Sequence, residues 1–156
     1  MSCWQWAAGE KRVCHLQVFD GTAWTCRAAL PAPRWAAASV ATRGGGRLLV
    51  LGGTTLRRAD EGDGDGSDDD DDDEAHTASA IEYDPHTDRW EAAAPLPAPD
   101  GACAATAHAG GAVVVVGGFG GPPWRRHRDG KTWSELPRFP GAERYRTPSV
   151  ASLVLG

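Results

Sequence analysis

The stretch GGGRLLVLGG, residues 44–53, decides the fold. Four consecutive apolar residues, Leu48 to Leu51, stand between a glycine turn and the pair Gly52-Gly53. An apolar run this short, bounded by glycines, favours a buried β-strand over a helix. Glycine ends such a strand because it tolerates positive φ and leaves room for a second backbone to approach. The stretch therefore predicts a sheet in which this strand ends at a tight turn.

The same pattern recurs along the chain. The sequence AGGAVVVVGG at 109–118 matches GGGRLLVLGG, with Gly117-Gly118 in register with the earlier glycine pair. Three further segments share a turn, a tryptophan and a Leu-Pro pair. They are FDGTAWTCRAALP at 19–31, YDPHTDRWEAAAPLP at 83–97 and RDGKTWSELP at 128–137. A fixed order of strand, double glycine, turn, tryptophan and Leu-Pro is an internal repeat.

The repeat resembles the kelch repeat, which forms one four-stranded blade of a β-propeller. In that family a double glycine ends a hydrophobic strand, and a Tyr and a Trp follow at set spacing. The residues that match this motif are Gly52, Gly53, Tyr83 and Trp90 in one repeat, Gly117, Gly118 and Trp133 in the next, and Phe19 and Trp24 in an earlier one. Arg128 takes the place of the tyrosine in the later repeat. The resemblance implies an all-β chain of kelch-type β-propeller blades, each a four-stranded antiparallel sheet, in an incomplete ring. The three tryptophans of the motif are expected to pack between blades.

The repeats divide the chain into successive segments. We expect an unassigned lead at 1–12, the C-terminal half of a blade at 13–34, a kelch blade at 35–97, a second kelch blade at 98–138 and the first strand of a further blade at 139–156. The strands expected in the two full blades are Ala36–Ala41, Leu48–Leu51, Ala80–Tyr83 and Arg89–Ala93, followed by Cys103–Ala107, Ala112–Val116, Trp124–Arg128 and Thr132–Leu136.

A closed propeller has about 4–8 blades, so this chain leaves strand edges open. Open edges favour pairing with other chains, which predicts self-association. Such a chain assembles with another chain, is an open fragment, or comes from an incomplete gene model. We favour the last, because the final blade stops after one strand.

An acidic insert, residues 57–77, interrupts the first full blade. Eleven of the fifteen residues at 60–74 are acidic, so the net charge of −5 divides into −11 on this run and +6 on the rest. Such a run repels itself and cannot be buried, which predicts a disordered loop. Successive connections in a meander alternate between the two ends of a blade. The insert joins the second and third strands, so we expect it at the same end as the interblade loops 31–34, 97–101 and 137–144.

The resemblance implies a non-catalytic module that binds another protein through its interblade loops. The residues expected to bind the partner are Arg34, Trp35, Asp100, Arg138 and Arg144. A flexible anionic arm favours a basic partner, by an attraction that salt weakens. The insert is otherwise a tolerated loop, or it folds back on arginines of its own chain. Some kelch proteins carry an F-box or BTB domain and act as substrate adaptors for ubiquitin ligases. No helical stretch of this sequence could supply either domain, so that role would require a longer chain.

The alternative function is a fragment of a galactose-oxidase-like copper enzyme, since that family holds copper with Tyr, His and Cys. The five histidines and four cysteines show no metal-ligand spacing, so neither a metal site nor a cofactor is predicted. No motif of a hydrolase, P-loop or dinucleotide site is present, and no catalytic residue is assigned.

Two further partner classes are not expected. The basic stretch from Trp124 to Arg128 suits a solvated loop, and the acidic run argues against nucleic acid. The first ten residues do not resemble a signal peptide, and the longest aliphatic run, Ala112 to Val116, is too short to span a bilayer. We therefore expect a soluble intracellular protein of the cytoplasm or nucleus that does not contact membranes.

Overall fold

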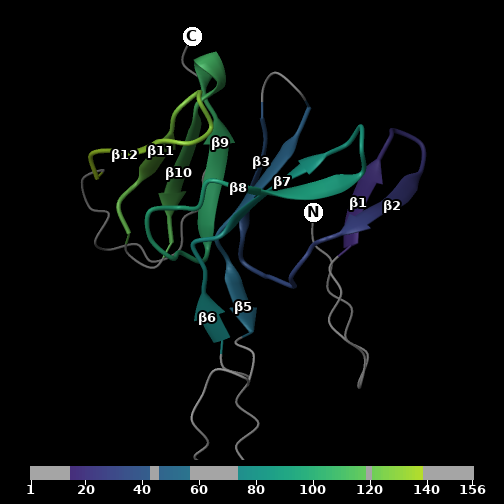
Figure 1. Cartoon of the computed structure of the whole chain (residues 1–156), viewed down its shortest axis with the longest axis horizontal. Helices are drawn as coiled ribbons and strands as arrows, with labels where there is room; N and C mark the ends of the chain where they lie inside the picture. The colour runs from purple at the N-terminus through teal and green to yellow at the C-terminus, as the bar shows by residue number, and fades with distance from the viewer. Residues whose placement is uncertain (1–14, 43–45, 57–73, 119–120, 139–156) are drawn as a thin grey trace, which may run out of the picture.

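The computed structural model of the chain describes residues 15–42, 46–56, 74–118 and 121–138, and these residues form antiparallel β-sheets (Figure 1). A single 3-10 turn, Ala109–Gly111, is the only helical element among them. Two four-stranded sheets and two two-stranded sheets are present, and the strands of this part of the chain do not close into a ring. The predicted all-β fold of antiparallel blades in an incomplete ring is confirmed.

The central blade is built from β3 (Ala38–Ala41), β4 (Leu48–Leu51), β7 (Ala80–Asp84) and β8 (Arg89–Ala93), in that spatial order. Strand β4 lies between β3 and β7, and its residues Leu49 to Leu51 are buried, as expected for a strand with neighbours on both sides. All four strands lie within two residues of the predicted positions: β3 begins at Ala38 instead of Ala36, and β7 ends at Asp84 instead of Tyr83.

The C-terminal blade repeats this order with β9 (Cys103–Ala107), β10 (Val113–Gly117), β11 (Trp124–Arg126) and β12 (Trp133–Glu135). Its four strands fall within one or two residues of the predicted positions. Strand β11 is shorter than predicted because the chain turns after Arg126, where His127 N–H donates to the Thr132 carbonyl at 2.9 Å.

The register of the two blades corrects one residue of the repeat motif. Tyr83 lies opposite Trp90 in the central blade, and Arg126 lies opposite Trp133 in the C-terminal blade. Arg126, rather than Arg128, therefore occupies the position of the motif tyrosine. The prediction for Arg128 is wrong because that residue lies in the turn that joins β11 to β12.

The N-terminal hairpin consists of β1 (His15–Phe19) and β2 (Trp24–Ala29), which pair with each other alone. Both strands were predicted as the outer half of a blade. Most of their side chains are exposed; Trp24 is 68% exposed, and its ring lies 5.1 Å from that of Phe19. The expectation that Trp24 packs between blades is therefore wrong. The predicted segments 1–12 and 139–156 lie outside the described residues.

A feature that the sequence did not predict is a small hairpin of β5 (Thr54–Leu56) and β6 (Glu74–His76), which projects from the blades (Figure 1). The predicted insert, 57–77, is therefore wrong at its C-terminal end. Glu74 to His76 pair with β5, and Thr77 N–H donates to the Gly53 carbonyl at 2.9 Å. Residues 57–73 lie outside the described residues.

The main core lies between the central and C-terminal blades. Its buried residues are Ala38, Leu49, Leu51, Ala80, Leu96, Cys103, Val113 and Val115. Ala38 and Cys103 come from the inner strands β3 and β9, whose small side chains allow the two blades to approach closely. A hydrogen bond of 2.9 Å from Ala102 N–H to the Ala36 carbonyl joins the blades beside these strands. Burial raises the pKa of the Cys103 thiol to about 11, so this cysteine is a packing residue.

Candidate functional site

The loop end, which we define as the end of the blades that carries the β5–β6 hairpin and the interblade loops, is a connected structure. Trp35 and Thr54 exchange two backbone hydrogen bonds of 3.1 and 2.8 Å, which tie the first interblade loop to β5. The second interblade loop is tied at Asp100, which accepts from Gly53 N–H at 2.8 Å and donates to the Thr77 carbonyl at 3.3 Å. The connection between the second and third strands thus lies at the predicted end.

Asp100 joins the double glycines of both full blades. Its main chain bonds to Gly53, and its carboxylate packs against Gly118. Both glycines have φ above 90°, and a Cβ on Gly53 would lie 2.7 Å from the Trp35 carbonyl oxygen. The glycine pairs are therefore needed because the interblade loops pass directly over the strand ends.

The structure places three of the predicted partner-binding residues together at the loop end. The Arg34 guanidinium donates from Nη1 to the carbonyls of Gly52 and Ser79, both at 3.3 Å. Trp35 is half-buried, whereas Asp100 is only 6% exposed. Arg34 and Asp100 thus hold the fold together, and a role of theirs in partner binding stays a prediction.

Of the remaining two predicted residues, the structure describes one. Arg138 is exposed and follows the last strand of the C-terminal blade. Arg144 lies outside the described residues. Partner binding by either residue stays a prediction.

Sequence reasoning missed the polar pair that links the two strands of the small hairpin. Thr54 Oγ1 and His76 Nδ1 lie 3.2 Å apart, and the imidazole also packs close to Gly101 in the second interblade loop. The only local signal was the β-branched pair Thr54-Thr55 after the glycines. Strands of three residues are too short to show a period-2 pattern.

The first interface, between the N-terminal hairpin and the central blade, is closed by three hydrogen bonds around Ala28. Trp90 Nε1 donates to the Ala28 carbonyl at 3.0 Å, and Ala28 N–H donates to Asp88 Oδ1 at 3.0 Å. Tyr83 donates its hydroxyl to the same Asp88 oxygen at 2.6 Å. The Tyr and Trp of this repeat therefore act as a clamp on the neighbouring strand.

The hydrogen bonds of the clamp change the pKa of two of its residues, Asp88 and Tyr83. Donation by Ala28 N–H and by the Tyr83 hydroxyl lowers the pKa of Asp88 below its ordinary value. Burial, followed by the bond to the Asp88 carboxylate, raises the pKa of Tyr83. Both shifts favour the protonation states that make the hydrogen bonds at neutral pH.

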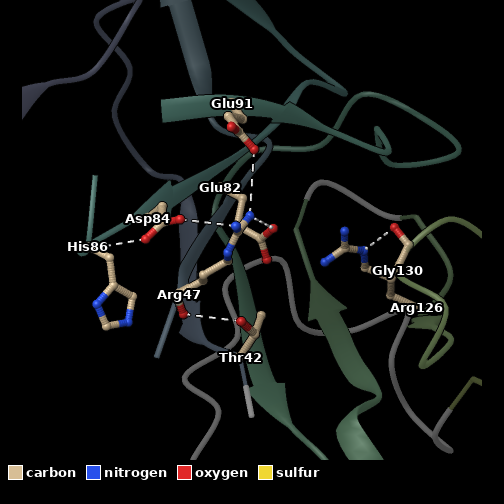
Figure 2. A network of polar contacts seen from close by, with 8 residues as sticks. All are labelled: Thr42, Arg47, Glu82, Asp84, His86, Glu91, Arg126 and Gly130. Carbon is tan, nitrogen blue, oxygen red and sulfur yellow. Dashed lines mark hydrogen bonds and ion pairs between the residues drawn. The ribbon is translucent and has the colours of Figure 1, made fainter. Parts of the chain in front are cut away.

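A polar network lies at the end of the central blade away from the loop end (Figure 2). Arg47 lies 3.0 Å from Asp84, 3.4 Å from Glu82 and 3.6 Å from Glu91. The nearby Asp84 charge raises the pKa of Arg47. One arginine thus serves three carboxylates of β7 and β8, which is a structural arrangement of partly exposed ion pairs.

In residues 15–42, 46–56, 74–118 and 121–138, no three His, Cys, Asp or Glu side chains gather in a way that would hold a metal ion. Over the same ranges, no helix has the length and apolar character needed to cross a bilayer.

Comparison with known proteins supports the fold alone. No protein-family model matches the chain, and no curated protein matches it. The solved structure of YjhT is similar, with a TM-score of 0.58 and 17% sequence identity. The match covers 79% of this chain and 43% of that chain, so this chain spans less than half the length of that neighbour.

Proposed function

We propose that this chain is part of a kelch-type β-propeller and is a non-catalytic module that binds a basic protein partner at its loop end. The motif residues Gly52, Gly53, Tyr83 and Trp90 support the kelch assignment, because the glycines make room for the interblade loops and the aromatic residues clamp the neighbouring strand. The likeness in fold to YjhT agrees with this assignment.

The observation that carries the proposal is the anchoring of the β5–β6 hairpin. Its first residues bond to one interblade loop at Trp35, and the residue after it bonds to the other at Asp100. The acidic sequence begins after β5 and ends in β6, so it starts and finishes on a fixed platform between two loops. Loops that a rigid scaffold holds in this way are common binding elements.

Charge indicates the kind of partner. The run at 60–74 carries −11, while the rest of the chain carries +6. Local negative charge of this density attracts a basic surface and accelerates its encounter with the loop end. The fixed loops then supply the contacts that select the partner.

The cellular role follows from the same proposal. A protein-binding propeller segment suits an intracellular protein of the cytoplasm or nucleus. Substrate-adaptor function, as in F-box/kelch and BTB/kelch proteins, would require a partner domain of that kind.

The proposal is tested with a fluorescent octalysine peptide as the basic probe. Its affinity for the whole chain is measured by anisotropy at low and at high salt. We expect binding that weakens by about tenfold or more between the two salt concentrations, because several charge contacts are screened. Replacement of Asp68 to Asp73 by asparagine should abolish most of this salt dependence, and replacement by glutamate should preserve it.

A second variant separates a binding site from simple attraction between charges. Trp35→Ala keeps the backbone bonds to Thr54 but removes a side chain of the first interblade loop. We expect it to weaken binding by about threefold to tenfold with an unchanged salt slope. Equal affinity in wild type, Trp35→Ala and the asparagine variant would show that the loop end does not bind the probe.

A further inference from the structure

The second interface, between the central and C-terminal blades, lacks the clamp that closes the first. Arg126 occupies the position of Tyr83, because each lies opposite the tryptophan of its blade. Lys131 occupies the position of Asp88, two residues before that tryptophan, and Ala94 occupies the position of Ala28, four residues after the tryptophan of the preceding repeat. All three replacements line one cavity of about 400 Å³. The place that the clamp fills in the first interface is therefore an open groove in the second.

Arg126 is the main polar group of this groove. The residue is only 7% exposed, and its guanidinium donates from Nε to the Gly130 carbonyl at 3.0 Å. Among the described residues, no carboxylate lies within ion-pair distance of it. Figure 2 shows Arg126 with this one bond, while the nearby Glu82 is joined to Arg47. A buried guanidinium without a counter-ion is unfavourable, because burial removes the water that would solvate its charge.

The tryptophan of the second interface is also left without its partner. Trp90 Nε1 donates to the Ala28 carbonyl, whereas Trp133 Nε1 is buried and finds no hydrogen-bond acceptor in the described part of the chain. The second interface therefore holds a buried Trp133 N–H without an acceptor and an Arg126 guanidinium without a carboxylate partner among the described residues. A buried donor without an acceptor is unusual in a folded protein and indicates a missing partner.

The charge around the groove is positive. Arg126, Arg128 and Lys131 line it, and in the described residues none of the three forms an ion pair. Two carboxylates line it as well, but both already have partners within the protein. Asp129 accepts from Lys131 N–H at 2.9 Å and from Thr132, and Glu82 pairs with Arg47 at 3.4 Å.

We propose that this groove binds a small oxyanion, the carboxylate or phosphate of a small organic molecule, with Arg126 as its principal ligand. A guanidinium has planar pairs of N–H donors that match both groups. Arg128 and Lys131 add positive charge at the rim, and the apolar wall of Ala92 to Ala94 receives the rest of the molecule. A volume of about 400 Å³ lies within the range of small-molecule sites.

The groove is distinct from the loop end. It is lined by residues of the β9–β10 and β11–β12 turns, Gly111 and His127 among them, and by Thr42 next to the β3–β4 turn. These turns lie at the opposite end of the blades from the β5–β6 hairpin, because connections alternate along each meander. Binding at the groove therefore does not depend on binding at the loop end.

The test uses NMR of the ¹⁵N-labelled whole chain. The probes are sodium acetate, sodium succinate and inorganic phosphate, each compared with sodium chloride at equal ionic strength. We expect saturable shifts of the Arg126 Nε–H and Trp133 Nε1–H resonances with dissociation constants in the millimolar range or tighter. Saturation by the carboxylates alone, or by phosphate alone, identifies which oxyanion the site prefers, and absence of saturation with all three overturns the proposal.

Two neighbouring arginines provide a matched pair of variants. Arg125 lies on the same strand, is exposed, and does not line the groove. We expect Arg126→Met to remove the saturable shift of Trp133 Nε1–H and Arg125→Met to retain it. An equal loss in both variants, or retention in both, would contradict the assignment of Arg126.

A further variant keeps the test valid if Arg126→Met does not fold. The double variant R126Y/K131D copies the Tyr83–Asp88 pair of the first interface into the second. We expect a higher Tm and no oxyanion response, because the clamp then fills the groove. A folded double variant that still binds the probes would overturn the proposal.

Glu82→Gln tests the remaining alternative, in which Glu82 serves Arg126 as a counter-ion across the groove. If the groove binds oxyanions, removing this negative charge should tighten binding by about threefold. Weaker binding in Glu82→Gln would contradict the proposed site.

Discussion

The two interfaces that flank the central blade share their backbone arrangement and differ in the side chains at equivalent positions. In both, a strand residue lies opposite a tryptophan across a hairpin, Tyr83 with Trp90 and Arg126 with Trp133. In the first interface Trp90 donates to Ala28 of the neighbouring strand, and Tyr83 donates to Asp88, which accepts from the Ala28 N–H; in the second interface the equivalent residues leave a groove of about 400 Å³. The repeat thus places equivalent residues at both interfaces. With tyrosine at residue 83 the side chains bond across the interface, and with arginine at residue 126 they leave a groove.

Among substitutions that disrupt the first interface, Trp90→Ala should cause the largest loss of stability. This change removes the bond to Ala28 and the ring that packs on Tyr83, so we expect a loss of about 2–3 kcal/mol in the free energy of unfolding, which is less than for a fully buried tryptophan. Urea denaturation measures it. Trp24→Ala is the control. Because Trp24 is 68% exposed, this substitution should lower the free energy of unfolding by about 0.5 kcal/mol or less. Equal losses in both variants would mean that the clamp does not stabilise the first interface.

Tyr83→Phe should have the next largest effect. It removes only the hydroxyl that donates to Asp88 at 2.6 Å, and a bond to a charged acceptor contributes about 1–2 kcal/mol. A double-mutant cycle with Asp88→Ala isolates the pair, and we expect the two substitutions to be non-additive. Strict additivity of the two substitutions would show that the pair does not act as a unit.

A smaller difference should separate Trp90 and Trp133 when each is changed to phenylalanine. Trp90→Phe loses the bond to the Ala28 carbonyl, whereas Trp133→Phe loses an N–H that has no acceptor in the described residues. We expect Trp90→Phe to cost about 1 kcal/mol more than Trp133→Phe in thermal or urea denaturation. The reverse order would remove the basis for treating the second interface as open.

The smallest expected effect is a dependence on pH that is confined to the first interface. The pKa of Asp88 is lowered in the folded protein, so its stabilising contribution is complete above the ordinary carboxyl pKa and is lost as the pH falls through the lowered value. Hydrogen exchange at the Ala28 amide should therefore lose protection progressively as the pH falls below the ordinary carboxyl pKa of about 3.9. The Ala94 amide should not follow, because Lys131 replaces Asp88 there.

Asp129 provides the contrast on the other side. The Thr132 N–H, the Lys131 N–H and the Thr132 hydroxyl donate to its carboxylate and lower its pKa to about 2. Its stabilising contribution to the β11–β12 turn is therefore lost only as the pH falls from the ordinary carboxyl pKa toward that value. Protonation of Asp129 should loosen this turn alone. Parallel loss of Ala28 and Ala94 protection would contradict the distinction between the interfaces.

Much of the fold was predictable because its signals are local. Short apolar runs bounded by glycine or proline predicted Leu48–Leu51 and the strands paired with it, and the structure has them in the expected order. The β5–β6 hairpin was missed because each strand has three residues. The sequence predicted Arg128, and not Arg126, at the tyrosine position. The register across the β11–β12 turn depends on which backbone groups pair, and the sequence does not show that pairing.

The candidate site was less predictable because burial and pairing are not local properties. The sequence located Arg34 and Asp100 in interblade loops but did not indicate that both bond or pack within the fold. Nor did it indicate that the arginine at the tyrosine position is buried without a carboxylate beside it in the described chain.

The sequence by itself determined the repeat, the strands and their order, since alternation, glycine pairs and turn residues act over a few neighbouring positions. Only the tertiary structure decided which interface closes and which remains open. The bond from Ala28 to Asp88 spans 60 residues, and the groove at Arg126 is formed by turns of two separate blades. Such contacts depend on how the sheets pack against each other, which the local pattern of residues does not specify.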